Sequence, residues 1–389
     1  MFEIANRWLA DDLQPNDSWD LTEIFTYEGF VSSRPARKFI LDFFTELYGK
    51  EIHFKNVKFK HQVKEAVVNG IKKFDSRLEL LVRNFKNHPE EYFPRAPFDG
   101  FLIYTDDDEL VGMYRIKRAR RVAEKVSRRM ADNFLSHIKK NAENLAQRRA
   151  RLLGIPLNML MSSREEMVTE FEAAERQLST QFSQGSINFR KEEIALHDVI
   201  GFKVIGDQEI LARAESIIKA RDSVNLDEKE HHKGSYNAVN FQLDLQLPPP
   251  GVIIDRTLSS INPPFPVRRG ISYEDLLAGF PTYVESGRSD VKFEVILTDY
   301  DELVESEIGR SIHEERTLKQ RKQREYTGRI AKNAEFIIEY LLSVAFSPKV
   351  DINFLPVKLL GHYLPETISY AIRELYDMEK SSIFHTVTF

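Results

Sequence analysis

Residues 197–206, HDVIGFKVIG, decide the fold, because they predict a short apolar strand with an acid at its start and a glycine inside it. A second apolar run, VKFEVILTD at residues 291–299, is interrupted inside the strand by Glu294. Between these runs, residues 207–224 have the apolar spacing of a helix, and residues 229–247 read as a loop that enters a strand. Strands that alternate with helices in this way predict an α+β fold with a mixed β-sheet flanked by helices.

Helical patterns precede and follow this predicted sheet. Residues 1–110 are expected to be mainly helical and to end in a β-hairpin, and residues 326–389 to form a C-terminal helical appendage. The domain that contains the sheet is then residues 111–325, with a helical insertion around residues 126–185. Residues 299–326 are predicted to form one charged helix.

The segment from Ile116 to Leu153 predicts one long basic helix, because its apolar residues recur at intervals of three and four. Lys117, Arg121 and Lys125 then fall on one face of that helix. A second helix is expected to start at Ser162 or Ser163, each of which has a glutamate three residues later, as in a capping box.

The composition limits the classes of function. The chain has 389 residues, 42% hydrophobic and 30% charged, which is ordinary for a globular protein. It has no cysteine, so disulfides, zinc ribbons and thiol catalysis are excluded. No apolar run is long enough to span a membrane, and the start has no secretory signal pattern, so we expect a cytoplasmic protein. With a net charge of −5, any binding of polyanions must come from local basic patches.

Three segments place polar residues at the ends or in the middle of predicted strands. They are Asp-x-x-Gly-x-Lys at residues 198–203, Lys-Gly-Ser-Tyr-Asn-x-x-Asn at residues 233–240, and a strand with Glu294 followed by Glu305, Glu307 and His313. An unpaired carboxylate buried in a strand would cost several kcal/mol, so a metal or a cation is expected to meet Glu294.

In this order and spacing the three segments resemble the synthetase domain of the RelA/SpoT alarmone family, over about residues 190–320. The resemblance implies a nucleotidyltransferase-like fold that transfers the diphosphate of ATP to the 3′-hydroxyl of GDP or GTP. The product is a (p)ppGpp-type alarmone, and the cofactor is Mg²⁺. Asp198 and Glu294 are then the catalytic and metal-binding residues. Asp198 would hold the magnesium ion, and Glu294 would either hold it or accept the proton of the ribose hydroxyl.

The resemblance also implies a set of nucleotide-binding residues. Tyr236 would stack on the acceptor base, and base stacking of this kind contributes roughly 1–3 kcal/mol. The others would contact phosphates or the nucleotide: Lys203, Lys233, Asn240 and His313. The ATP-binding element of the family, Arg-x-Lys-x-x-x-Ser-x-x-x-Lys, is matched in spacing by Arg115, Lys117, Arg121 and Lys125, with arginine in place of serine.

Departures from the family pattern leave alternatives open. Asn240 replaces a histidine, and the strand of Glu294 lacks the usual glutamine and arginine, which favours a non-catalytic nucleotide sensor as one alternative. The long basic helix favours another, a toxin that modifies the 3′ end of tRNA or an adenine nucleotide. Besides ATP and an acceptor nucleotide, the expected partners are therefore tRNA, a second copy of the chain or an antitoxin, and no membrane. A histidine–aspartate hydrolase centred on His197 is disfavoured, because no matching ligand set precedes it.

Overall fold

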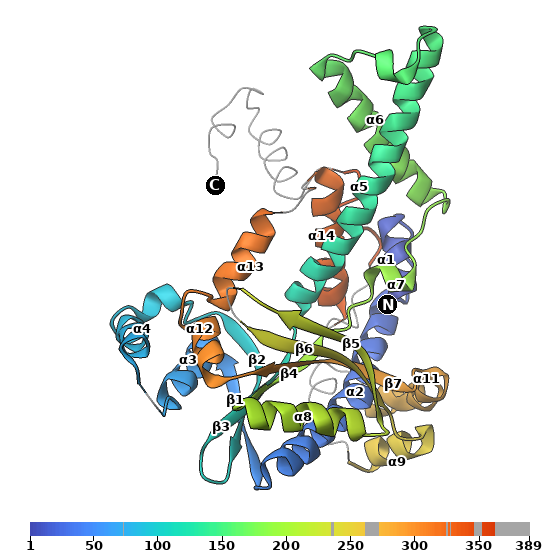
Figure 1. Ribbon diagram of the computed structural model, residues 1–389. Helices are drawn as coiled ribbons and strands as arrows, with labels where there is room; N and C mark the ends of the chain where they lie inside the picture. Colours follow the sequence, from blue (N-terminus) through green and yellow to red (C-terminus); the bar gives the residue numbers. More distant parts are fainter. Residues whose placement is uncertain are drawn as a thin grey trace, which may run out of the picture. The chain divides into compact units, whose positions relative to one another are not determined.

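The computed structural model describes residues 1–72, 74–234, 237–260, 272–323, 326, 328–345 and 352–361. These residues divide into two compact units (Figure 1), and each unit draws on separate stretches of the chain. One unit contains the described residues within 1–24, 119–195 and 324–361, and the other contains those within 25–118 and 196–323. The three-part division expected from the sequence stays a prediction.

The first unit is helical. Its elements are α1 (Phe2–Leu9), the start of α2 (Asp17–Tyr48), α5 (Ala119–Leu152), the short 3-10 turn η2 (Leu157–Met159), α6 (Arg164–Ser183), α7 (Lys191–Ile194) and α14 (Arg329–Val344). Helix α5 packs along α14 and α6. The predicted long basic helix is confirmed, although it starts at Ala119, so Lys117 lies before it. The predicted capping box is also confirmed, since Ser163 and Glu166 each accept a backbone N–H of the other residue.

The second unit contains one seven-stranded mixed sheet, as the sequence predicts. The strand order is β1-β2-β3-β4-β7-β6-β5, in which β4 and β7 run parallel and the other neighbours run antiparallel. The strands are β1 (Ile52–Phe59), β2 (Pro97–Thr105), β3 (Leu110–Ile116), β4 (Ile200–Ile205), β5 (Val224–His232), β6 (Ala238–Gln246) and β7 (Asp290–Thr298).

The same unit also contains the helices that surround or extend from this sheet (Figure 1). They are the remainder of α2, α3 (Lys60–Asn69), α4 (Ser76–Asn87), the turn η1 (Pro89–Tyr92), α8 (Gln208–Ala220), α9 (Pro250–Ser260), α10 (Tyr273–Ala278), α11 (Phe280–Ser286), α12 (Tyr300–Glu307) and α13 (His313–Lys322). Among the described helices, none is both long enough and apolar enough to cross a membrane.

The two faces of the sheet differ because side chains alternate along each strand. On one face, Phe202, Phe241 and Val295 pack with Phe39 and Phe43 of α2 in a single buried aromatic core. On the opposite face, residues of β1 to β4 pack with α3, α4 and α12 in a second core. The charged side chains of β3, β4, β6 and β7 lie on this second face, so the core of α2 anchors the strands that carry them.

Two local predictions were wrong. Residues 229–232, expected in a loop, belong to β5, an edge strand whose side chains are mostly exposed and therefore carry no apolar alternation. Residues 52–59 form β1, inside the region that was expected to be mainly helical. The charged helix at 299–326 is two helices, α12 and α13. The chain turns at Gly309, where a Cβ would lie 2.7 Å from the Glu305 Cα, so a larger residue would require the backbone to shift.

Candidate active site

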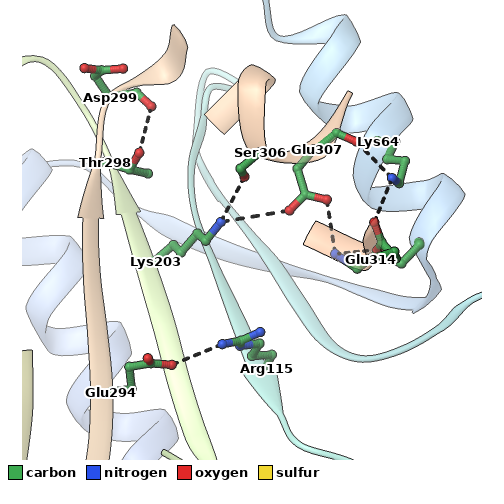
Figure 2. Close-up of polar contacts among 10 residues, drawn as sticks. Lys64, Arg115, Lys203, Glu294, Thr298, Asp299, Ser306, Glu307 and Glu314 are labelled. Carbon is green, nitrogen blue, oxygen red and sulfur yellow. Dashed lines mark hydrogen bonds and ion pairs between the residues drawn. The ribbon is translucent and has the colours of Figure 1, made fainter. Parts of the chain in front are cut away.

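The centre of the sheet carries a row in which a glycine stands between two charged residues. The strand register pairs Gly201 of β4 with Arg115 of β3 on one side and with Glu294 of β7 on the other. Because Gly201 has no side chain, Arg115 reaches across it, and its Nη2 lies 3.1 Å from Glu294 Oε2 (Figure 2). A Cβ at Gly201 would lie 3.2 Å from the backbone oxygen of Glu294 and 3.4 Å from its Oε2. The missing side chain at Gly201 therefore leaves room for the Arg115–Glu294 ion pair.

Lys117 brings the two predicted catalytic carboxylates under one ammonium group. Its Nζ lies 2.9 Å from Asp198 Oδ2 and 3.9 Å from Glu294 Oε2, and it also donates to the carbonyl oxygen of Asp198. The backbone N–H of Lys117 donates to the Val199 carbonyl oxygen at 2.8 Å, which ties the end of β3 to the residues before β4. The side chains of Asp198 and Glu294 are 19% and 15% exposed, so solvent or a ligand reaches both.

This carboxylate pair, Asp198 and Glu294, has the donor chemistry of a magnesium site. Mg²⁺ in nucleotide-dependent enzymes is usually held by one or two carboxylates together with phosphate oxygens and water. Within the described ranges, no group of three His, Asp or Glu side chains could hold a metal alone. The Lys117 ammonium group lies next to both carboxylates, which shows that a cation fits at this position. The residues therefore fit the predicted ion, provided that a nucleotide supplies further oxygens.

Asn240 faces the same carboxylate from the next strand. Asn240 Nδ2 donates to Glu294 Oε1 at 3.4 Å, a long hydrogen bond. Its Oδ1 is enclosed and accepts no hydrogen bond within the described part of the chain. Because an enclosed polar atom without a partner costs free energy, Asn240 is suited to accept a hydrogen bond from a bound ligand.

Lys203, two residues after Gly201, faces a second set of charged groups on the same side of the sheet (Figure 2). Its Nζ lies 3.9 Å from Glu307 Oε1 at the end of α12 and 3.5 Å from Ser306 Oγ. The other oxygen of Glu307 lies 3.1 Å from Lys60 Nζ of α3. We call the following five residues the lysine cluster: Lys60, Lys64, Lys203, Glu307 and Glu314.

Burial sets the charge states near the lysine cluster. It lowers the pKa of Lys203 to about 8, although the nearby Glu307 carboxylate opposes this shift. Burial alone would raise the pKa of Glu307, but the attraction of Lys60 and Lys203 outweighs it and lowers that pKa to about 2. Burial, with repulsion from Lys60 and Arg115, holds the pKa of His313 well below its usual value. At neutral pH, Glu307 is therefore ionised and His313 is a neutral imidazole.

The loop between β5 and β6 lies outside this row. Tyr236, predicted to stack on the acceptor base, lies outside the described residues, and Lys233 beside it is exposed. The following residue, Asn237, is fixed to α12, because its backbone N–H and its Nδ2 donate to the Glu302 carboxylate at 2.8 and 2.7 Å. A hollow of about 100 Å³ adjoins this loop. Its lining residues are Asp75, Arg77, Leu78, Gly234, Asn237, Asp301, Glu302, Glu305 and Arg310.

The predicted ATP element is divided between the two units. Arg115 and Lys117 belong to the unit that contains the sheet, and they contact Glu294 and Asp198. Arg121 and Lys125 lie on α5 in the helical unit, where Arg121 Nη1 forms an ion pair with Glu124 at 2.7 Å. The first two residues therefore join the row on the sheet, and the role of the last two in binding ATP stays a prediction.

Sequence reasoning missed Lys60 and Lys64, which lie outside the stretch that resembles the synthetase family. The available signal was two lysines four residues apart at the start of a helix, where they share one face. That spacing is common on solvated helices, and it gives no indication that a glutamate 247 residues later in the chain meets Lys60. Only the tertiary structure brings these groups together.

The chain was compared with protein families, curated sequences and solved structures. Neither a protein-family model nor a curated protein sequence matches this chain. Among solved structures, the chain is similar to the crystal structure of the small alarmone synthetase 1 from Bacillus subtilis. The two chains are 11% identical, the similarity covers 81% of this chain and 97% of the other, and the TM-score is 0.24. A score this low carries no detail of a site, so the roles proposed below rest on this chain's own residues.

Proposed function

We propose that this chain transfers the diphosphate group of ATP to the 3′-hydroxyl of a guanine nucleotide, which yields a (p)ppGpp-type alarmone and AMP. The proposal rests on one observation: the ammonium group of Lys117 lies next to both Asp198 and Glu294. Arg115 and Lys203 lie on the same side of the sheet, so carboxylates for a metal and cations for phosphates face one space. The order of the three sequence motifs supports the same assignment.

The reaction needs little covalent chemistry from the protein. The 3′-hydroxyl oxygen attacks the β-phosphorus of ATP and forms a new bond to it. The bond between that phosphorus and the oxygen bridging to the α-phosphate breaks, and AMP leaves with the bridging oxygen. Enzymes promote such transfers mainly by positioning the reactants and stabilising the charge that spreads over the phosphate oxygens.

Each residue of the row has a proposed role in this step. Glu294 accepts the proton of the 3′-hydroxyl, and Arg115 beside it orients the carboxylate and then stabilises the phosphate oxygens. Asp198, with Glu294, would hold the Mg²⁺ that neutralises charge on the phosphates. Lys117 holds the carboxylates together in the absence of the ion and contacts phosphate oxygens in its presence.

The acceptor subsite is proposed on the loop between β5 and β6. Tyr236 stacks on the base, and Lys233, Lys203 and His313 contact the phosphates of the acceptor. A neutral imidazole at His313 can still donate one hydrogen bond to a phosphate oxygen. Asn240 replaces the histidine of the family pattern and offers its enclosed Oδ1 to a hydroxyl donor of the ligand.

The decisive experiment follows the label from ATP to its product. The purified chain is incubated with Mg²⁺ and with ATP labelled at either the β- or the γ-phosphate, in separate reactions with GDP, GTP, ADP and deacylated tRNA. Diphosphate transfer moves both labels to the acceptor and releases AMP, whereas a simple kinase moves only the γ-label. Transfer to GDP or GTP supports the proposal, and absence of transfer to all four acceptors contradicts it and favours the nucleotide sensor.

The basic face of α5 distinguishes a nucleotide from a tRNA acceptor. If Arg121 and Lys125 bind ATP, replacing both by Ala raises the ATP concentration needed for transfer. If they bind a tRNA backbone, the same change leaves ATP use intact and reduces the salt dependence of RNA binding by about two ion contacts. A solvated face gives neither effect, and ATP binding would then rest on Arg115 and Lys117.

A further inference from the structure

Helix α3, which lies outside the stretch that resembles the synthetase family, supplies Lys60 and Lys64 to the charged groups around Glu307, and Figure 2 shows Lys64 beside Glu314. Lys60 is its first residue, and its backbone N–H donates to the Ala96 carbonyl oxygen at 2.8 Å. Lys64 follows one turn later, on the same side of the helix. The start of α3 is therefore fixed next to β2, and both side chains point toward α12 and α13.

The two lysines of α3 have different surroundings. Lys64 is fully enclosed, and its Nζ donates to the backbone oxygen of Glu307 at 2.8 Å and to Glu314 Oε2 at 3.2 Å. Lys60 is 12% exposed, and its Nζ lies 3.1 Å from Glu307 Oε2 and 3.4 Å from Glu314 Oε1. Lys64 therefore links α3 to Glu307 and Glu314, whereas Lys60 lies at the edge of the cluster, where a ligand can reach it.

The Glu307 carboxylate is shared between two ammonium groups. One oxygen faces Lys60 Nζ at 3.1 Å, and the other faces Lys203 Nζ at 3.9 Å. Within the described part of the chain, the three lysines of the lysine cluster face two carboxylates, and these side chains are at most 17% exposed. An excess of buried positive charge is unfavourable unless an anion compensates it. A phosphate group between Lys60 and Lys203 would provide that compensation.

We infer that Lys60 is a phosphate-binding residue, which acts with Lys203 on the same phosphate group of a bound polyphosphate. This inference rests on the proposed function for the identity of the polyphosphate, but the anion site itself follows from the cluster. Glu307 holds both ammonium groups in place when the site is empty. On binding, each ammonium group exchanges part of its contact with Glu307 for phosphate oxygens, which are strong hydrogen-bond acceptors.

The test uses inorganic pyrophosphate as the probe and calorimetry as the readout, at pH 7.5 and without metal. The full chain is expected to bind pyrophosphate, and Lys60→Gln is expected to weaken binding by about tenfold or more, as for loss of a charged hydrogen bond. Lys60→Arg, which keeps the charge, should restore most of the affinity. The matched control is Lys72→Gln, because Lys72 is 71% exposed and its ammonium group forms an ion pair with Glu109 at the surface. Equal affinity of the Lys60→Gln variant and the original chain overturns the inference.

A second measurement needs no variant and therefore does not depend on folding of Lys60→Gln. Lysines of the original chain are acetylated with and without pyrophosphate, and the extent at each site is read by mass spectrometry. Pyrophosphate is expected to protect Lys60 several-fold and to leave Lys72 unchanged. Equal acetylation of Lys60 in both samples contradicts the inference.

These outcomes separate the inference from the proposed function. If the chain transfers diphosphate and Lys60→Gln changes neither pyrophosphate binding nor the ATP requirement, the inference fails and the function stands. If pyrophosphate binds through Lys60 but no acceptor receives a diphosphate, the function fails and the anion site stands.

Discussion

Two neighbouring groups of charged side chains differ in their balance of charge. Asp198 and Glu294 face two cations, Lys117 and Arg115, whereas the lysine cluster has three ammonium groups and two carboxylates. Asp198 and Glu294 are 19% and 15% exposed, while Glu307 is 3% exposed. Because Asp198 and Glu294 are partly exposed and their charge is matched by cations, a metal ion could replace the Lys117 ammonium group beside them. An enclosed cluster with a surplus cation favours an anion instead. In the proposed function, the carboxylate pair would hold the metal ion and the lysine cluster would contact phosphate groups.

The strongest test of this comparison is Asp198→Asn. It removes one charge from the carboxylate pair and keeps the side-chain shape, so several kcal/mol of metal-dependent stabilisation should be lost. We expect diphosphate transfer to fall at least about a hundredfold, measured with labelled ATP at saturating acceptor. The exposed Asp222→Asn serves as the control and should keep the original rate. A normal rate in Asp198→Asn would remove Asp198 from the metal site.

The next largest effect is expected on stability, from Lys64→Met in the lysine cluster. Lys64 is fully enclosed, so its loss leaves Glu314 partly unpaired and should lower the free energy of unfolding by about 3–5 kcal/mol. Urea denaturation monitored by circular dichroism measures the change. The exposed pair of Lys72 with Glu109 provides the contrast, since Lys72→Met should cost no more than about 1 kcal/mol. Equal effects would mean that burial does not distinguish the two ion pairs.

Gly201→Ala tests whether the close approach of Glu294 to Gly201 is needed to position the Glu294 carboxylate. The new Cβ would lie 3.2 Å from the Glu294 backbone oxygen and 3.4 Å from its Oε2, so the carboxylate must shift by a few tenths of an ångström. Because catalysis is sensitive to such displacements, we expect the transfer rate to fall about tenfold while pyrophosphate binding is retained. Gly251→Ala, at a position with nothing within 4 Å of the new Cβ, is the control. An unchanged rate would show that the close approach at Gly201 is not needed.

The smallest expected effect is a dependence of anion binding on pH. Burial lowers the pKa of Lys203 to about 8, so this residue loses its charge as the pH rises through that value. We expect metal-free ATP to bind several-fold more weakly at pH 9.5 than at pH 7.5, measured by calorimetry, and Lys203→Arg to remove the dependence. A flat profile in the original chain would contradict the low pKa of Lys203.

The same shift has a defined sign for stability. The folded chain releases the Lys203 proton near pH 8, whereas an unfolded lysine keeps its proton to about 10.5. Between these values the unfolded state binds more protons, so the contribution of Lys203 to the free energy of unfolding increases with pH. Urea denaturation of the original chain and Lys203→Met across this range isolates the contribution.

By itself, the sequence determined the elements whose signals are local. The apolar runs around Gly201 and Glu294 identified β4 and β7, and the capping box at Ser163 identified the start of α6. Such features depend on periodicity and on hydrogen bonds between residues close in the chain. The requirement that a cation meet the Glu294 carboxylate was also predictable, because burial of an unpaired charge is unfavourable.

Only the tertiary structure decided which groups meet. Arg115 pairs with Glu294 because β3, β4 and β7 are adjacent, and Lys60 reaches Glu307 because α3 and α12 cover the same side of the sheet. No local pattern encodes these contacts, since they depend on strand order and register across residues far apart in the chain. The edge strand β5 escaped prediction for a related reason: it is defined by its hydrogen-bonded pairing with β6, while its own side chains are mostly exposed.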